Sequence, residues 1–480
     1  MLLAATTGGL VALYRLPVVL AVVGAVALLA VAAYQRVAAV AMLAAITLPL
    51  FLSASTGLTL LQPGGGRFSE EEGGLSVQIS LVLIGVLAGL AWVCRTATKR
   101  PPVPLFGRGL VAGLLLLYTL SIWVGFTKGA GLLGFAFYAQ TIIPLLAWYA
   151  AAANRITPRA ASLTVVGCTL AALLYVIAVG VGSGGLTGSY AVVETLVRTI
   201  PQYRNLFPFI VVCGLALAIT GWNQHRKTSI GLFAAAVLTL PMTWSRTGVA
   251  MMAIAVSVAF FARPGRASTT TRMLLGILGG ILLGTYALRT VLSGVLGERQ
   301  SVGTTLEASG ETRAGLATEA LDRIAGNPLL GDTFVPETSV LVSARDSAHL
   351  FPAHNQYLDI ALRGGVLALV LTVVLLFVFA RRAWRLRRSP DPQVAAFHAA
   401  LLAIIAAVAS GSFAQLYLIQ PWTGGLFFAL LGVSSACMSG DEPEVSQRGD
   451  ERVDDRRVRA RGDARVGGLG DRGRAVEPHR

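Results

Sequence analysis

Arg246 lies at a break between two apolar segments, where it could bind an anion. The local sequence is Trp244-Ser245-Arg246-Thr247-Gly248. A guanidinium group presents a planar fork of donors, which matches phosphate oxygens better than a lysine ammonium does. A helix beginning near Thr247 would add its N-terminal amides to the same anion site. The alternative is an interfacial arginine whose side chain snorkels to lipid headgroups.

His354 is the histidine best placed for proton transfer. It lies in Phe351-Pro352-Ala353-His354-Asn355, at the end of a long polar stretch and just before an apolar run. An unperturbed imidazole has a pKa of about 6.5, which suits proton exchange near neutral pH. The alternative is an ordinary loop histidine followed by Asn355 as a helix cap.

The sequence has no motif for a nucleotide, and we expect no metal and no cofactor. It contains neither a phosphate-binding loop of the form GxxxxGK[ST] nor an HExxH zinc motif. The four cysteines are isolated inside apolar segments, without the spacing of metal ligands or redox pairs. We interpret them as small buried side chains.

The composition is that of a membrane protein. The chain has 480 residues, of which 55% are hydrophobic and only 13% are charged, against roughly 25% charged residues in soluble domains. A formal net charge of +15 would also fit a nucleic-acid-binding protein. However, the arginines cluster in short loops between apolar runs, which is the pattern of cytoplasmic loops in membrane proteins. We therefore expect membrane lipid and no nucleic acid as a partner.

Apolar segments of membrane-spanning length recur along the chain. A spanning helix needs about 20 mostly apolar residues, and the sequence predicts an all-α polytopic bundle of twelve to thirteen spans. The candidate segments are residues 17–34, 37–61, 77–94, 105–126, 132–153, 161–181, 206–221, 230–244, 248–262, 273–292, 357–380, 394–413 and 422–438.

The orientation follows from the basic loops. Residues 381–388 carry five arginines, so we place this loop in the cytoplasm. Counting back one span at a time places every other strongly basic loop on the same side. The remaining loops, residues 62–76, 182–205, 245–246 and 293–354, fall outside. Arg198 and Arg204 lie in the loop 182–205, against the usual charge bias, so each is a candidate for substrate contact.

The long external loop predicts a helix of its own. Residues 312–324 place apolar side chains at helical spacing, with charges opposite, and Pro328 prevents the helix from continuing. The apolar residues of this predicted face are Leu316, Ala320, Leu321 and Ile324.

The chain divides into four predicted parts. The last of them is rich in Arg, Asp, Glu and Gly, and cannot bury enough apolar surface to fold, so we expect a disordered cytoplasmic tail. The parts are an N-terminal transmembrane bundle (1–293), the external loop with its amphipathic helix (294–355), the C-terminal transmembrane helices (356–438) and the tail (439–480).

These pieces together resemble the O-antigen ligase and O-antigen polymerase superfamily of membrane glycosyltransferases. The resemblance is sharp over roughly residues 244–380 and rests on the order and spacing of short motifs. The motifs are Ser245-Arg246-Thr247-Gly248, the arginine-led helix 313–324, Asn327-Pro328-Leu329-Leu330-Gly331, His354-Asn355-Gln356-Tyr357-Leu358 and Gly364-Gly365.

The resemblance implies an enzyme of the bacterial inner membrane that works in surface polysaccharide assembly, with its active site on the external face. Such an enzyme transfers a glycan from an undecaprenyl-diphosphate carrier to a hydroxyl of a glycan, lipid or protein acceptor. It needs no metal, because the diphosphate is itself the leaving group, and it inverts the anomeric carbon. Fixed cations must stabilise the leaving diphosphate, and a base must reach the acceptor hydroxyl.

Carried over by position, Arg246 and Arg313 resemble the diphosphate-binding arginines of the family. His354 resembles its catalytic histidine, which either deprotonates or positions the acceptor. Arg204, and with it Arg198, would add cationic contacts to the substrate.

Two residues that follow the histidine complete the predicted site. Asn355 would orient His354 or cap the next helix, and Tyr357 is a candidate substrate contact.

The motifs do not separate a ligase from a polymerase of the same superfamily. A transporter or flippase for lipid-linked glycans is an alternative of another class. It would predict ionisable residues at the membrane midplane, whereas Glu194, Glu298 and Glu319 all fall in loops.

Overall fold

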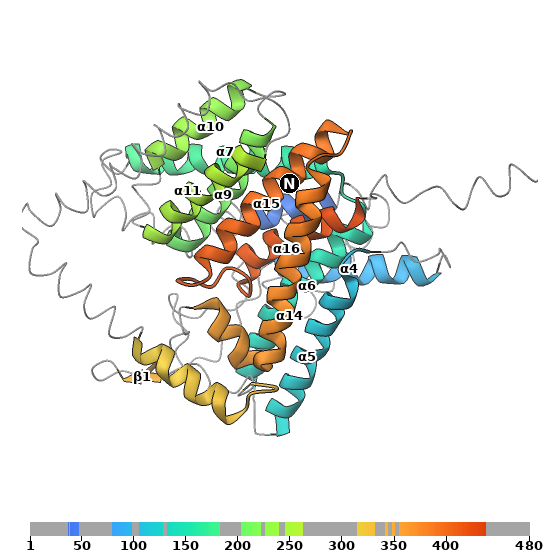
Figure 1. The fold of residues 1–480 in the computed structure, drawn as a ribbon, viewed down its shortest axis with the longest axis vertical. Helices are drawn as coiled ribbons and strands as arrows, with labels where there is room; N and C mark the ends of the chain where they lie inside the picture. The colour runs from blue at the N-terminus through green and yellow to red at the C-terminus, as the bar shows by residue number, and fades with distance from the viewer. Residues whose placement is uncertain are drawn as a thin grey trace, which may run out of the picture. The chain divides into compact units, whose positions relative to one another are not determined.

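The computed structural model describes the parts of the chain that carry most of the predicted helices (Figure 1). All of these residues belong to one compact unit, Met1–Cys437. The described residues are 37, 39–47, 79–97, 105–127, 132–182, 203–221, 226–239, 245–262, 314–331, 341–343, 348–350 and 355–437. The predicted spans 17–34 and 273–292 and the tail 439–480 lie outside them, and the predicted division into four parts stays a prediction.

Helices dominate the described residues, which confirms the predicted all-α class. The long helices are α4 (Ile79–Ala97), α5 (Arg108–Thr127), α6 (Leu132–Ala153), α7 (Pro158–Gly182), α9 (Tyr203–Thr220), α10 (Arg226–Thr239), α11 (Arg246–Ala262), α14 (Gln356–Leu386), α15 (Pro392–Gly411) and α16 (Pro421–Ala436). A further helix, residues 314–326, lies in the long loop.

One element was not predicted. Residues of the long loop form a short antiparallel hairpin of β1 (Leu341–Ser343) and β2 (Ala348–Leu350), with Val342 opposite His349. Three-residue strands are too short to show a period-two pattern in the sequence.

Several helices extend past the apolar segments into predicted loops. α10 begins at Arg226 and α14 continues to Leu386, so charged residues form a terminal turn of each helix. Arg and Lys are good helix formers, so hydropathy alone places the start of α10 too late and the end of α14 too early. α7 begins at Pro158, where proline is favoured because the first helical turn needs no amide donor.

Four of the described helices, α5, α7, α14 and α15, are long and apolar enough to cross a membrane. Shorter apolar stretches of 10–17 residues lie in α4, α6, α9, α11 and α16. Large apolar side chains project outward from α5 and α14; Trp123 and Phe377, for example, are 71% and 67% exposed. Such surfaces are costly in water but suit contact with lipid. The chain is a multi-pass membrane protein.

Small residues let the helices inside the bundle pack closely. α6 and α16 are close neighbours because Gly432 lies against the backbone of Trp148, where an added methyl group would overlap the Trp148 carbonyl oxygen. The Trp148 indole nitrogen also donates to Ser435 Oγ at 2.9 Å. Close approach at small residues is typical of helix packing in membranes.

Candidate functional site

Three of the predicted site residues lie outside the described residues: His354, Arg313 and Arg198. Arg204 belongs to the first turn of α9, and Arg246 is the first residue of α11, but the structure describes only the backbone of these two arginines. Asn355 and Tyr357 are described in full. The structure therefore describes the helices that carry or follow these residues, and the site is built from those helices.

The helices that carry Arg204, Arg246 and Asn355 begin at one end of the bundle, around the C-terminal end of α15. At the start of α11, Gly248 packs on Pro208 of α9. One turn further, Met251 contacts Gly411, the last residue of α15. Three separate segments thus bring helix N-termini, which favour anions, to a common place.

The start of α11 explains the Ser-Arg-Thr-Gly motif. The Gly248 amide donates to Ser245 Oγ at 3.0 Å, and the Val249 amide donates to the Ser245 carbonyl oxygen at 3.1 Å. Ser245 therefore caps the helix. Gly248 is required because an added methyl carbon would lie 2.5 Å from Pro208 Cβ. These two residues fix Arg246 at the first position of the helix.

The start of α14 is capped by Asn355. Its side-chain oxygen accepts from the amides of Tyr357 at 3.0 Å and Leu358 at 3.4 Å. The Tyr357 hydroxyl donates to the Ala409 carbonyl oxygen at 2.7 Å, and its ring lies 4.8 Å from that of Phe413. These contacts hold the first turn of α14 against α15, immediately after His354 in the sequence.

Gln356 was missed by the sequence analysis. The backbone amide of Gln356 donates to the Ser412 carbonyl oxygen at 2.8 Å, and its side-chain oxygen accepts from the Leu418 amide at 2.8 Å. The side chain is fully buried. Gln356 thus ties the start of α14 to residues 412–420, which we name the connection because they join α15 to α16. The sequence did contain a signal for this role, because Gln356 is a polar residue directly before an apolar segment.

The helix formed by residues 314–326 packs on α14, as the predicted amphipathic face requires. Leu316, Ala320 and Ile324 are buried against Ala361 and Leu362 of α14.

The prediction was wrong for Leu321, which is 54% exposed. Positions 316, 320 and 324 follow a spacing of four and form one stripe, whereas Leu321 is turned about 100° away from its neighbour Ala320.

Two glycines with left-handed backbone lock the end of this helix to α14. Gly331 has a φ of 71° and Gly365 a φ of 72°, a region that side chains rarely adopt. Each glycine lies directly on the other segment's backbone: a methyl group on Gly331 would overlap the Leu362 carbonyl oxygen, and one on Gly365 the Leu329 carbonyl oxygen. We name this contact the glycine lock. It explains why the motifs Asn327–Gly331 and Gly364-Gly365 occur together: the two segments lie directly on each other.

Hydrogen bonds reinforce the glycine lock. The Val366 amide donates to the Pro328 carbonyl oxygen at 2.8 Å. Ser121 of α5 adds its hydroxyl, which lies 2.6 Å from the Arg363 carbonyl oxygen and 3.1 Å from that of Leu330. The helix that follows Arg313 and the helix that follows His354 are thereby held together and to the bundle.

A shielded ion pair lies beside the glycine lock. Arg363 Nε donates to Asp359 Oδ2 at 2.8 Å, and Arg363 Nη1 donates to Thr141 Oγ1 of α6 at 3.0 Å. The Asp359 side chain is only 7% exposed. The pair joins α14 to α6 next to the kink at Gly365.

Asp359→Ala should lower the free energy of unfolding by about 3 kcal/mol, because it leaves the Arg363 charge shielded without its partner. Thermal unfolding in lipid nanodiscs measures the effect. Glu319→Ala is the matched control, since it breaks a more exposed pair with Arg323, at 2.7 Å and also four residues apart; we expect a change below about 1 kcal/mol. Equal losses in both variants would contradict a structural role for the shielded pair.

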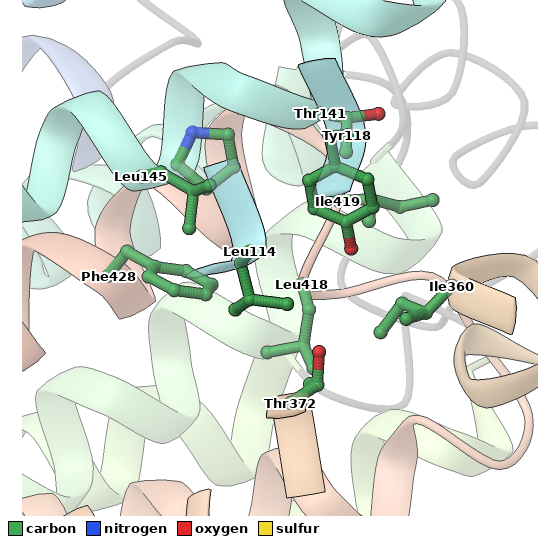
Figure 2. A pocket seen from close by; sticks show the side chains of 10 residues that line it. Leu114, Tyr118, Thr141, Leu145, Ile360, Thr372, Leu418, Ile419 and Phe428 are labelled. Carbon is green, nitrogen blue, oxygen red and sulfur yellow. The ribbon is translucent and has the colours of Figure 1, made fainter. Parts of the chain in front are cut away.

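A small cavity lies between α5, α6, α14, α16 and the connection (Figure 2). Its walls are mostly apolar, with hydroxyl groups from Tyr118, Thr141 and Thr372. A cavity volume of about 10 Å³ has room for about one water molecule. The cavity is too small for a sugar ring or a lipid chain. Within the described residues, no group of three or more His, Cys, Asp or Glu side chains could hold a metal ion.

Comparison with known proteins assigns part of the chain. The family model described as O-antigen ligase matches residues 231–373, and no curated protein matches the chain. The matched segment holds most of α10, all of α11, the helix 314–326, the glycine lock and the first half of α14. Over residues 231–373 the chain is similar to the O-antigen ligase family, which confirms the resemblance predicted from the sequence.

Proposed function

We propose that the protein transfers a glycan from an undecaprenyl-diphosphate carrier to an acceptor hydroxyl during surface polysaccharide assembly. The family match supports a membrane function of the O-antigen ligase and polymerase kind. The observation that carries the specific reaction is the convergence of α9, α11 and α14 around the end of α15, seen in the contacts Gly248–Pro208, Met251–Gly411 and Gln356–Ser412. These are the helices whose first turns carry, or directly follow, the predicted site residues.

In the proposed reaction, the carrier diphosphate binds to Arg246 and Arg313. The first backbone amides of α11 add to this anion site. The acceptor oxygen attacks the anomeric carbon from the face opposite the diphosphate. As that C–O bond forms, the bond to the carrier oxygen breaks, and undecaprenyl diphosphate leaves with the electron pair. The arginines stabilise the charge that develops on the leaving oxygen.

His354 acts on the acceptor hydroxyl in the proposed reaction. It takes the proton of the acceptor hydroxyl, or holds that hydroxyl in line with the breaking bond. The basic residues 381–388 at the far end of α14 favour a cytoplasmic location for that end. The start of α14, and the site with it, would then face the exterior. The proposed chemistry uses no metal.

Deleting the gene tests the function and separates its variants by the length and attachment of surface polysaccharide. If the protein is a ligase, its loss should leave long chains on the lipid carrier. Short chains that are still attached indicate the polymerase of the same superfamily, and lipid-linked glycan retained on the cytoplasmic face indicates a flippase. Surface polysaccharide of normal length and attachment would contradict the proposal.

A further inference from the structure

Four buried polar side-chain atoms belong to Gln356, at the start of α14, and to the connection to which Gln356 is hydrogen-bonded. They are Gln356 Nε2, Ser412 Oγ, Tyr417 Oη and Gln420 Oε1, and none of them has a hydrogen-bond partner among the described residues. Of all the buried side-chain polar atoms without a partner in the described part of the chain, only Arg387 Nε lies elsewhere. We name these four atoms the polar cluster.

An isolated buried polar atom is costly. Each donor or acceptor that loses water without gaining a partner costs roughly 1–3 kcal/mol, and such atoms in folded proteins usually bind an ordered water or a ligand. Side chains of Gln356, Ser412 and Tyr417 are fully buried. Four such atoms on two segments that are hydrogen-bonded to each other indicate that a partner is missing there.

The polar cluster lies beside the elements that carry the predicted site. Gln356 is two residues after His354, and its backbone amide donates to the Ser412 carbonyl oxygen. On the other side, the Tyr417 ring stacks on Phe209 of α9, with ring centroids 5.7 Å apart. Phe209 adjoins Pro208, which packs on Gly248 at the start of α11. The connection thus links the start of α14 to the starts of α9 and α11.

The chemistry of the polar cluster suits hydroxyl groups. Gln356 Nε2 donates, Gln420 Oε1 accepts, and the Ser412 and Tyr417 hydroxyls can do either. None of the four groups is charged, so they would bind a phosphate only weakly. A sugar hydroxyl, in contrast, can both donate and accept hydrogen bonds and can pair with all four. We propose that the polar cluster binds hydroxyl groups of the transferred or the accepting glycan, a role that rests on the proposed function.

Glycan binding requires the connection to shift, because all four atoms are shielded from solvent. Hydrogen bonds and packing hold the connection in place. The Gln356 side-chain oxygen accepts from the Leu418 and Ile419 amides at 2.8 and 3.4 Å, and the Thr423 hydroxyl donates to the Tyr417 carbonyl oxygen at 2.7 Å. The side chains of residues 416–419 are buried. Residues between Ser412 and Gln420 form turns and bends without a regular helix. These hydrogen bonds must open, and the buried side chains of residues 416–419 must shift, for the polar cluster to become accessible.

Tyr417→Phe and Ser412→Ala test the proposal, since each removes only an atom without a protein partner. The expected midpoint of thermal unfolding is equal to or above that of the wild type. The KM for the glycan-bearing substrate should rise about threefold to tenfold in each variant, the equivalent of one hydrogen bond. The matched control is Ser435→Ala, which removes a buried hydroxyl that has partners in Trp148 and Leu431. It should lower the unfolding midpoint and leave the KM unchanged.

Binding to the full-length protein in nanodiscs separates the possible outcomes. The probes are undecaprenyl diphosphate with the host's repeat unit, the same carrier without sugar, and the free repeat-unit oligosaccharide. Weaker binding of only the sugar-bearing carrier assigns the polar cluster to the donor, and weaker binding of the free oligosaccharide assigns it to the acceptor.

Unchanged binding of every probe by both variants would overturn the proposal and leave the polar cluster as a site for water only. If the wild type binds the glycan but does not transfer it, and the variants bind it more weakly, the proposed function fails while the inference stands.

Discussion

His354→Ala, Arg246→Ala and Arg313→Ala should each abolish detectable glycan transfer while the protein still inserts into the membrane. A positioned acid–base group contributes about 10²–10⁴-fold to a rate. A fixed donor that stabilises developing charge contributes about 10²–10³-fold. Each loss is therefore at least about a hundredfold. The measurement is transfer from purified lipid-linked glycan to acceptor, normalised to the amount of inserted protein.

Two further arginine variants make this experiment specific. Arg323→Ala removes an arginine of the helix 314–326 that forms a partly exposed pair with Glu319, and it should keep nearly wild-type transfer. Arg246→Lys keeps the charge but loses the planar fork, so it should recover only part of the rate. Wild-type turnover by all three alanine variants would remove the proposed reaction.

Gly365→Ala should have the second largest effect, because it disrupts the glycine lock. A side chain at a φ of 72° costs about 1–3 kcal/mol. The added methyl group would also overlap the Leu329 carbonyl oxygen, and overpacking costs about 1–3 kcal/mol more. The segment 327–331 must move away from α14, and the helix that follows Arg313 moves with it. We expect a lower unfolding midpoint and a loss of transfer of at least about tenfold.

Gly315→Ala is the matched control for the glycine lock. Gly315 lies in the same external helix, but an added methyl group there meets no other atom within 4 Å. Alanine also favours a helix over glycine by about 1 kcal/mol, so this variant should be as stable as the wild type or more so. Gly331→Ala should behave like Gly365→Ala. If all three variants transferred at the wild-type rate, the lock would not position the site.

Local patterns in the sequence were sufficient to predict the described helices and the Asn355 cap of α14. The apolar segment 132–153 coincides with α6, and the break at Trp244–Gly248 coincides with the start of α11. The spacing of Leu316, Ala320 and Ile324 gave the packing face of the external helix. Each of these features depends on residues within a few turns of one another, which periodicity records.

Contacts between distant segments could not be predicted in this way. Gln356 meets Leu418, and Arg363 meets Thr141, across 62 and 222 positions of the chain. Neither partner is marked by a local pattern, because a single glutamine or threonine in an apolar run has many possible environments. Gly365 was recognised as part of a motif, but the backbone contact that requires a glycine there appears only when residues 327–331 are seen packed on α14.

The central claim is that guanidinium groups and an imidazole meet around a lipid-linked diphosphate, and an experimental structure with bound carrier tests it most directly. We predict that undecaprenyl diphosphate with its glycan, bound to the His354→Ala protein in nanodiscs, places its diphosphate within hydrogen-bond distance of both Arg246 and Arg313. The anomeric carbon should face position 354. A diphosphate bound away from these arginines, or bound at the end of the bundle near residues 381–388, would contradict the account.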